Sequence, residues 1–428
     1  MSLNLRSMSH KRDTSFGLGM WTAALFAAVT LFLVACSSVT ADGPDRTVQS
    51  SPEALPAVDV SGMNVPISLD GLEVLDPSWA TPPQYSSGIY LGAREQETAL
   101  EFIAISIHGE TLWSVERPLS CTGFTVTEMS DGTPLAVLVD TKTNSDTAAT
   151  NSATAYDLET GEIAWGPVDL PGTFQGPGLV FASPPEEFMG SNGPRIALSP
   201  DTGNIIADER DGDLRIIGDF SGTILTVEGD SLIARTSHDN QKLWEVDATE
   251  YGWEPSQIRG SVNELTADTH ALLTIGQGPG PVIDLATGEV VVESAREMGV
   301  DPATGTVIVL EGNSLHSFEP TNKSQWSVTV TPDTTIATVG GVFVYLREGD
   351  AIRVHNVLTG AVAMAYEADA PGAILVPAHL QPNGAGLLYN ADGDLLIAAV
   401  PQVQNDSGVA GRPKTPSPPV EQHEPTSP

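Results

Sequence analysis

The chain has 428 residues, with 19 Lys plus Arg against 55 Asp plus Glu and a formal net charge of −36 at pH 7. This charge argues against a nucleic-acid-binding protein, because phosphate backbones are bound by basic surface. The 41 Gly, 32 Pro and 6% aromatic residues favour short strands and turns over long helices.

The N-terminal segment has the organisation of an export signal. Three basic residues precede an uncharged stretch at positions 16–35, as in a secretory signal. The stretch ends in Leu33-Val34-Ala35-Cys36, which resembles the lipobox of bacterial lipoproteins. The resemblance implies that 1–35 is a cleaved signal peptide and that Cys36 is lipidated. An uncleaved transmembrane helix is the alternative, since about 20 apolar residues can span a bilayer. Both predict an extracytoplasmic chain held at the cell membrane.

The composition beyond the signal divides the chain into three parts. We predict a flexible tether at 36–59, a folded domain at 60–401 and a disordered Pro-rich tail at 402–428. If Cys36 carries lipid, Cys121 has no partner for a disulfide and is interpreted as a buried small apolar side chain.

One motif recurs along the folded part at intervals of roughly 42 residues, a period typical of four-stranded propeller blades. It contains a polar residue, Thr-Gly and an apolar run, often with Trp four residues after the Gly. The anchors of the repeat are Gly109 with Trp113, Gly161 with Trp165, Gly203, Asn240 with Trp244, Gly288, Asn322 with Trp326, and Gly360. The similar segment Asp301–Gly305 falls too close to Gly288 and is predicted to be a turn within the next blade.

A second motif supports the same register. Glu228-Gly229-Asp230, Glu311-Gly312-Asn313 and Glu348-Gly349-Asp350 each follow an apolar run and predict a tight hairpin. In the fourth copy these signals predict strands at 214–220, 223–228, 231–237 and 241–246. Each repeat is therefore expected to be a four-stranded antiparallel sheet.

At this point the sequence resembles the pyrroloquinoline-quinone-like (PQQ-like) β-propeller repeat, most closely at 155–165. The resemblance implies an all-β propeller of seven or eight blades whose Trp side chains pack between blades. The last hairpin, at 390–395, has no outer strand after it, and the run Val65 to Leu75 is a suitable donor. We therefore predict eight blades closed by an N-terminal strand, with seven as the alternative.

The resemblance also raises the possibility of a quinone-dependent enzyme. The chain lacks the adjacent cysteine pair of such enzymes, and it has no G-x-S-x-G, P-loop or H-E-x-x-H motif. The segment Gly276–Gly280 is interpreted as a hairpin. The acidic segment Asp208–Asp213 is interpreted as a solvated turn, with a Ca²⁺ site as the alternative. We predict no catalytic residue, no metal and no cofactor.

The function predicted from the sequence is that of a membrane-anchored, non-catalytic binding or scaffolding platform. Its expected partner is a protein of the cell envelope, with no nucleic acid, and the chain itself is expected to be a monomer. The alternatives are a quinone- or Ca²⁺-dependent surface oxidoreductase and a cell-wall glycan-binding protein, for which the Trp residues would supply a stacking surface.

Overall fold

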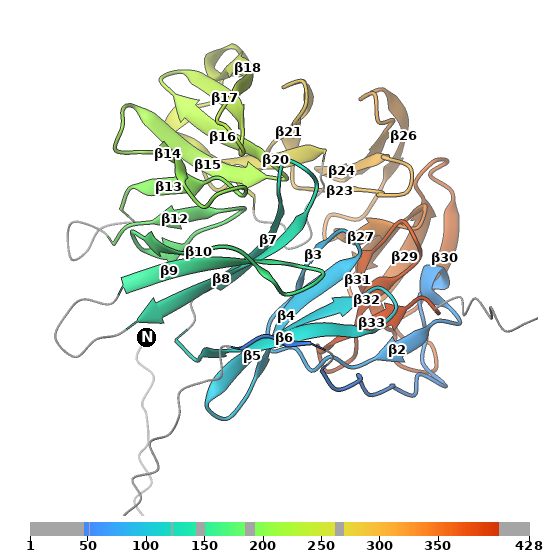
Figure 1. The fold of residues 1–428 in the computed structure, drawn as a ribbon. Helices are drawn as coiled ribbons and strands as arrows, with labels where there is room; N and C mark the ends of the chain where they lie inside the picture. Colours follow the sequence, from blue (N-terminus) through green and yellow to red (C-terminus); the bar gives the residue numbers. More distant parts are fainter. Residues whose placement is uncertain are drawn as a thin grey trace, which may run out of the picture. The chain divides into compact units, whose positions relative to one another are not determined.

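The described residues of the computed structural model are 47–50, 52–120, 123–142, 150–184, 193–261 and 269–401. They form eight antiparallel sheets, which are the blades of an all-β propeller (Figure 1). The signal peptide with Cys36, the residue Cys121 and the tail 402–428 lie outside the described residues, so these predictions stand as they were made. The helical elements among the described residues are the 3-10 helices η1 (Ile67–Leu69), η2 (Ala248–Tyr251) and η3 (Pro255–Gln257). None of the helices in this part of the chain has the length and hydrophobicity of a membrane span.

The strands follow the blades in chain order, and in each blade the first strand is the inner one. Blade 1 contains β3 (Gln84–Ser86), β4 (Ile89–Glu95), β5 (Ala99–Ser106) and β6 (Thr111–Pro118), and blade 2 contains β7 (Gly123–Glu128), β8 (Pro134–Lys142), β9 (Thr150–Asp157) and β10 (Ile163–Leu170). Blade 3 contains β11 (Thr173–Phe174), β12 (Val180–Ala182), β13 (Arg195–Leu198) and β14 (Ile205–Asp208), and blade 4 contains β15 (Leu214–Phe220), β16 (Thr223–Glu228), β17 (Ser231–Thr236) and β18 (Lys242–Asp247).

The other four blades follow the same plan. Blade 5 contains β19 (Ile258–Gly260), β20 (His270–Ile275), β21 (Gly280–Asp284) and β22 (Val290–Ala295), and blade 6 contains β23 (Glu297–Val300), β24 (Val307–Glu311), β25 (Ser314–Phe318) and β26 (Ser324–Thr329). Blade 7 contains β27 (Thr335–Gly340), β28 (Phe343–Glu348), β29 (Ala351–Asn356) and β30 (Val362–Tyr366), and blade 8 contains β31 (Val376–Leu380), β32 (Gly386–Tyr389), β33 (Leu395–Ala399) and β2 (Glu73–Leu75).

Blade 4 shows how the sequence builds one unit. Its strands agree with the predicted ranges to within one residue at each end. Ser221 and Gly222 both have positive φ, of 47° and 83°, as a two-residue type I′ hairpin requires. Residues 223–227 of β16 are buried on both faces of the sheet. A strand buried in this way needs packing partners on both sides, which the neighbouring blades provide.

The apolar core is divided into clusters that lie between successive blades. One cluster joins blades 4 and 5, with Ile217, Trp244 and Leu273 among its members. Another joins blades 1 and 8, where Ile103 packs with Leu387 and Ile397. The ring is therefore closed by apolar contacts as well as by backbone pairing.

An N-terminal strand supplies the outer strand of the last blade, as predicted. In β2, Glu73 pairs with Ala399 and Leu75 with Ile397 of β33. Figure 1 shows this blue strand beside the red end of the folded chain. The predicted eight-bladed ring is confirmed, and the seven-bladed alternative is wrong because the hairpin before β33 belongs to a complete eighth sheet.

Part of the range predicted as a tether pairs with the blades. The strand β1 (Gln49–Ser50) lies antiparallel to β6 and gives blade 1 a fifth strand. The amide of Val58 donates to the carbonyl of Val74 at 2.8 Å. Composition alone suggested a flexible segment at 36–59, but backbone hydrogen bonds to an open strand edge depend little on side-chain composition.

Two segments interpreted as turns from the sequence are turns in the structure. Asp301–Gly305 connects β23 to β24 within blade 6, and Gly276 to Pro279 connect β20 to β21 within blade 5.

Candidate functional site

The predicted repeat anchors meet across neighbouring blades, not within one motif. Trp113, on β6 of blade 1, donates its indole N–H to the carbonyl of Leu158 in blade 2 at 2.8 Å. The same ring lies over Gly161, where an added Cβ would come 2.9 Å from the indole Cγ. The motif glycine therefore makes room for the tryptophan of the preceding blade.

Three other junctions repeat this contact, and the remaining predicted anchor meets a leucine. Trp165 donates its indole N–H to the carbonyl of Pro200 at 2.7 Å, beside Gly203. Trp244 donates to the carbonyl of Leu285 at 2.8 Å, beside Gly288. Trp326 donates to the carbonyl of Val357 at 2.7 Å, beside Gly360. Gly109 contacts Leu75 of β2 instead. These tryptophans are inter-blade packing residues and do not form a common ligand-binding surface.

Two of the junctions without the tryptophan also lack the glycine. The residue at the tryptophan position is Ala207 on β14 and Val292 on β22. The blades that follow carry Asn240 and Asn322 at the turn position where the others have Gly. Without an indole to accommodate, this turn position can carry a side chain. Comparing each anchor with the residue at the tryptophan position of the preceding repeat would have revealed this correlation from the sequence.

At the junction of blades 5 and 6, which has no indole, polar side chains form hydrogen bonds with one another. The amide nitrogen of Asn322 donates to Asp284 Oδ2 at 3.0 Å and to Glu289 Oε2 at 2.9 Å. Its amide oxygen accepts from His270 Nε2 at 3.0 Å. The polar groups of this junction therefore satisfy one another.

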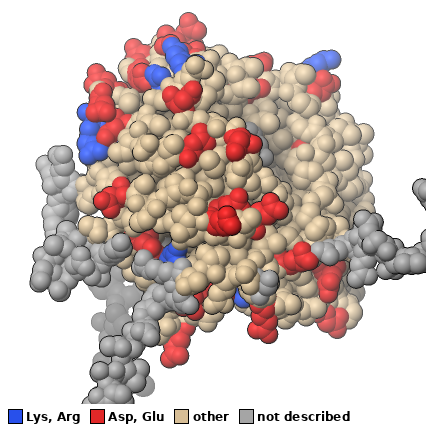
Figure 2. Space-filling view, in the orientation of Figure 1, with Lys and Arg blue, Asp and Glu red and all other residues tan. Residues whose placement is uncertain are grey.

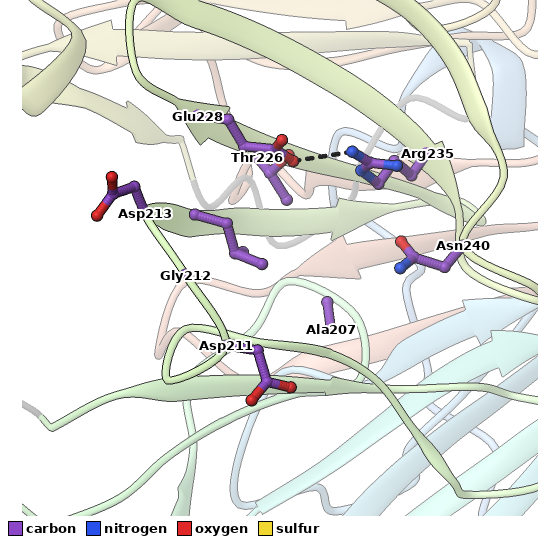
Figure 3. Close-up of a pocket in the computed structure, with 9 residues that line it drawn as sticks. Ala207, Asp211, Gly212, Asp213, Thr226, Glu228, Arg235 and Asn240 are labelled. Atoms are coloured by element: carbon purple, nitrogen blue, oxygen red, sulfur yellow. Dashed lines mark hydrogen bonds and ion pairs between the residues drawn. The ribbon is translucent and has the colours of Figure 1, made fainter.

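The junction of blades 3 and 4 is open and contains a cavity of about 300 Å³. Strands β14 to β17 and the loops beside them contribute its lining, which consists of Ala207, Asp211, Gly212, Asp213, Leu214, Thr226, Glu228, Arg235 and Asn240. Figure 3 shows Asp211 on one side of the space and Thr226, Glu228 and Arg235 on the other, with the short side chain of Ala207 between them. Asn240 Oδ1 is buried and has no hydrogen-bond partner among the described residues.

The acidic segment Asp208–Asp213 contributes two of its carboxylates to this cavity. Asp208 pairs with Arg210, and Glu209 pairs with Arg195 at 3.2 Å, so these two residues hold the loop in place. Asp211 and Asp213 instead line the cavity. The described residues contain no group of three or more His, Cys, Asp or Glu side chains arranged to hold a metal ion.

The cavity presents an uneven balance of charge. Arg235 pairs with Glu228 at 3.0 Å, which leaves the carboxylates of Asp211 and Asp213 without a second cation in the lining. Carboxylates are also spread over the face shown in Figure 2, where basic side chains lie at only a few places. The potential in the cavity therefore favours a cation.

The carboxyl group with the most strongly raised pKa is not part of the cavity. Burial raises the pKa of Asp219 to about 6, against hydrogen bonds from the amides of Gly222 and Leu179. Asp219 lies on β15 against the loop that contains Gly178. It is packed between blades 3 and 4 and is not among the residues that line the cavity.

No protein-family model matches the chain, and no curated protein matches it. Solved structures with partial likeness include a eukaryotic initiation factor, with 11% identity, 70% of this chain and 94% of that chain covered, and a TM-score of 0.36. Another is the Cps50 (Swd1) β-propeller domain of Myceliophteria thermophila, with 9% identity, 76% of this chain and 99% of that chain covered, and a TM-score of 0.36. A third is KlHsv2 with loop 6CD replaced by a Gly-Ser linker, with 10% identity, 72% of this chain and 92% of that chain covered, and a TM-score of 0.35. These comparisons assign neither a family nor a function, and the strand pairing itself shows the fold.

Proposed function

We propose that the chain is an exported lipoprotein, anchored at the membrane through Cys36, whose propeller binds another protein without catalysing a reaction. Its blades are of the PQQ-like repeat type in this proposal. A propeller commonly serves as an interaction platform, because a rigid ring supports loops that present a broad surface. The extracytoplasmic location is supported by the apolar stretch at 16–35 and by the four residues that end at Cys36.

The observation that carries the binding function is the open junction of blades 3 and 4. Its cavity combines the carboxylates of Asp211 and Asp213, a buried amide oxygen with no partner among the described residues and a small apolar floor. A cavity of about 300 Å³ lies at the lower end of the volumes typical of ligand sites. Of the nine lining residues, Thr226 alone carries a hydroxyl group, and it donates to Glu228 Oε1 at 3.3 Å. This arrangement suits recognition of a polar or cationic group better than nucleophilic chemistry, which needs an activated nucleophile beside a base.

Crosslinking in intact envelopes tests the proposal. The chain is rich in carboxylates and poor in amines, so a carboxyl-reactive dihydrazide linker is the suitable reagent. The wild-type chain should sediment with membranes and form a crosslink to the same protein in repeated preparations. The matched variant Cys36→Ser should be released from the membrane and lose that crosslink.

Two results would contradict this function. Equal membrane association of wild type and Cys36→Ser would remove the lipid anchor from the proposal. Turnover of an alcohol or a sugar by the purified chain after addition of quinone and Ca²⁺ would replace the binding platform by an oxidoreductase.

A further inference from the structure

We propose that the cavity between blades 3 and 4 binds a planar aromatic ring that carries a positive charge, with the ring in the place that an indole fills at four other junctions. This inference builds on the proposed binding function and specifies the chemistry of its ligand.

The shape of the site follows from the repeat. At four junctions the outer strand of one blade places an indole against the turn of the next, and its N–H donates to a carbonyl at 2.7 to 2.8 Å. On β14 the corresponding residue is Ala207, which is 7% exposed and lines the cavity. The fold therefore retains room for a flat ring but provides no side chain to occupy it. The apolar part of the lining, Ala207 and Leu214, gains dispersion energy when a flat ligand packs on it.

The polar end of the site is provided by Asn240. Its Oδ1 is buried without a hydrogen-bond partner among the described residues, and an unmade hydrogen bond of this kind is unfavourable. Asn240 lines the cavity, so a rotation of its side chain would bring this acceptor to a ring N–H that enters the space. The comparable Asn322 already accepts from His270 at 3.0 Å, so the junction of blades 5 and 6 has no such vacancy.

The charge of the ligand follows from the acidic lining. Asp211 and Asp213 line the cavity together with the Glu228–Arg235 pair, whose shortest N–O distance is 3.0 Å. Glu228 offsets the charge of Arg235, and the two aspartates leave a net negative potential. An ammonium group attached to the ring is attracted by this potential, whereas a carboxylate on the same ring is repelled.

Calorimetric titration of the full chain in detergent with three probes tests these points. Tryptamine has the ring and the positive charge, indole-3-acetate has the ring with a negative charge, and butylamine has the positive charge without a ring. We expect tryptamine to bind at least tenfold more tightly than either of the other probes. Absence of tryptamine binding at millimolar concentration, or equal binding of indole-3-acetate, would overturn the proposal.

Two sets of variants locate the binding. Ala207→Trp with Asn240→Gly rebuilds the indole–glycine contact of the other junctions and should abolish tryptamine binding without lowering the melting temperature. If this double variant does not fold, Ala207→Met fills the same space with a flexible side chain and should weaken binding at least tenfold. Asp211→Asn with Asp213→Asn keeps the cavity and should weaken tryptamine several-fold while reducing the discrimination against indole-3-acetate. Unchanged binding in a folded variant with a filled cavity would place the ligand elsewhere and refute this site.

The outcome separates this inference from the proposed function. A protein crosslink that persists in the variant with a filled cavity would retain the platform and reject the aromatic site as its means of recognition. Binding of tryptamine by a chain that forms no protein crosslink would retain the site and reject the protein-binding platform.

Discussion

At the scale of single residues, the junction of blades 1 and 2 contains a buried ion pair. Arg117 on β6 is 2% exposed, and its Nε lies 3.4 Å from Oδ1 of Asp140 on β8. The guanidinium also donates to the hydroxyl of Tyr156 and, at 2.8 Å, to the carbonyl of Glu116. In a chain with so few basic residues, this arginine connects two blades through groups that are shielded from water.

Replacing Arg117 by Ala removes the arginine from the buried Asp140 carboxylate, and we expect a loss of about 3–5 kcal/mol in the free energy of unfolding. Chemical denaturation at pH 7 measures this loss. The double variant Arg117→Met with Asp140→Leu removes both charges and should lie much closer to the wild type. An equal loss in the single and the double variant would show that packing, and not the broken ion pair, accounts for the effect.

At the scale of the element, the turn between the last two strands of a blade is shaped by its neighbour. Gly161 has a φ of 74°, and an added Cβ would lie 2.7 Å from Val48 Cγ1 and 2.9 Å from Trp113 Cγ. A side chain at position 161 is therefore disfavoured for two reasons. The backbone is left-handed there, and the added atoms would push the indole out of contact.

Gly161→Ala should lower the free energy of unfolding by about 2–5 kcal/mol, since the backbone contributes about 1–2 kcal/mol and displacement of a packed side chain about 1–3 kcal/mol. Gly229→Ala is the matched control, because Gly229 has a φ of 59° and an added Cβ would meet nothing within 4 Å. The difference between the two variants in denaturant titrations isolates the packing cost. Equal losses would mean that the indole moves aside freely.

The period of the motif and the offset of the second motif were sufficient to predict the four-stranded plan of the blades and the strand ranges of blade 4. The partner of each anchor was not predicted, because the motif places Gly161 and Trp165 four residues apart although each packs on a different neighbour. The cavity was missed for the same reason. Ala207 and Asn240 belong to different repeats and come together only when the repeats are stacked. Pairing of β1 with β6 was also unforeseen, since a two-residue strand depends on an available edge more than on its own sequence.

At the scale of the whole molecule, the ring is closed where blade 8 meets blade 1. His379 on β31 lies within 3.2 Å of the Tyr90 hydroxyl on β4, and its ring packs on Tyr85 at a centroid distance of 4.9 Å. Burial lowers the pKa of His379 from 6.5 to about 4. The imidazole is therefore neutral in the folded ring.

The free energy of unfolding of the closed ring should fall in mild acid. Below pH 6.5 the unfolded chain binds a proton at this histidine, whereas the folded chain does so only near pH 4, so stability falls as the pH is lowered through this window. The loss attributable to His379 should approach roughly 3 kcal/mol at pH 4. Melting temperatures of wild type and His379→Gln between pH 7 and pH 4 measure it, and the variant should lose less stability over that range. Parallel curves for the two proteins would show that His379 titrates normally in the ring.

The pairing of β2 with β33 has a consequence for the biosynthesis of this protein. Leu75 is made early, but its partner Ile397 is added only when the last blade is almost complete. Until then the nascent chain holds an incomplete sheet at each end, with apolar edges that invite pairing with other polypeptides. A chaperone that shields Glu73–Leu75 during this interval would protect the growing chain from aggregation.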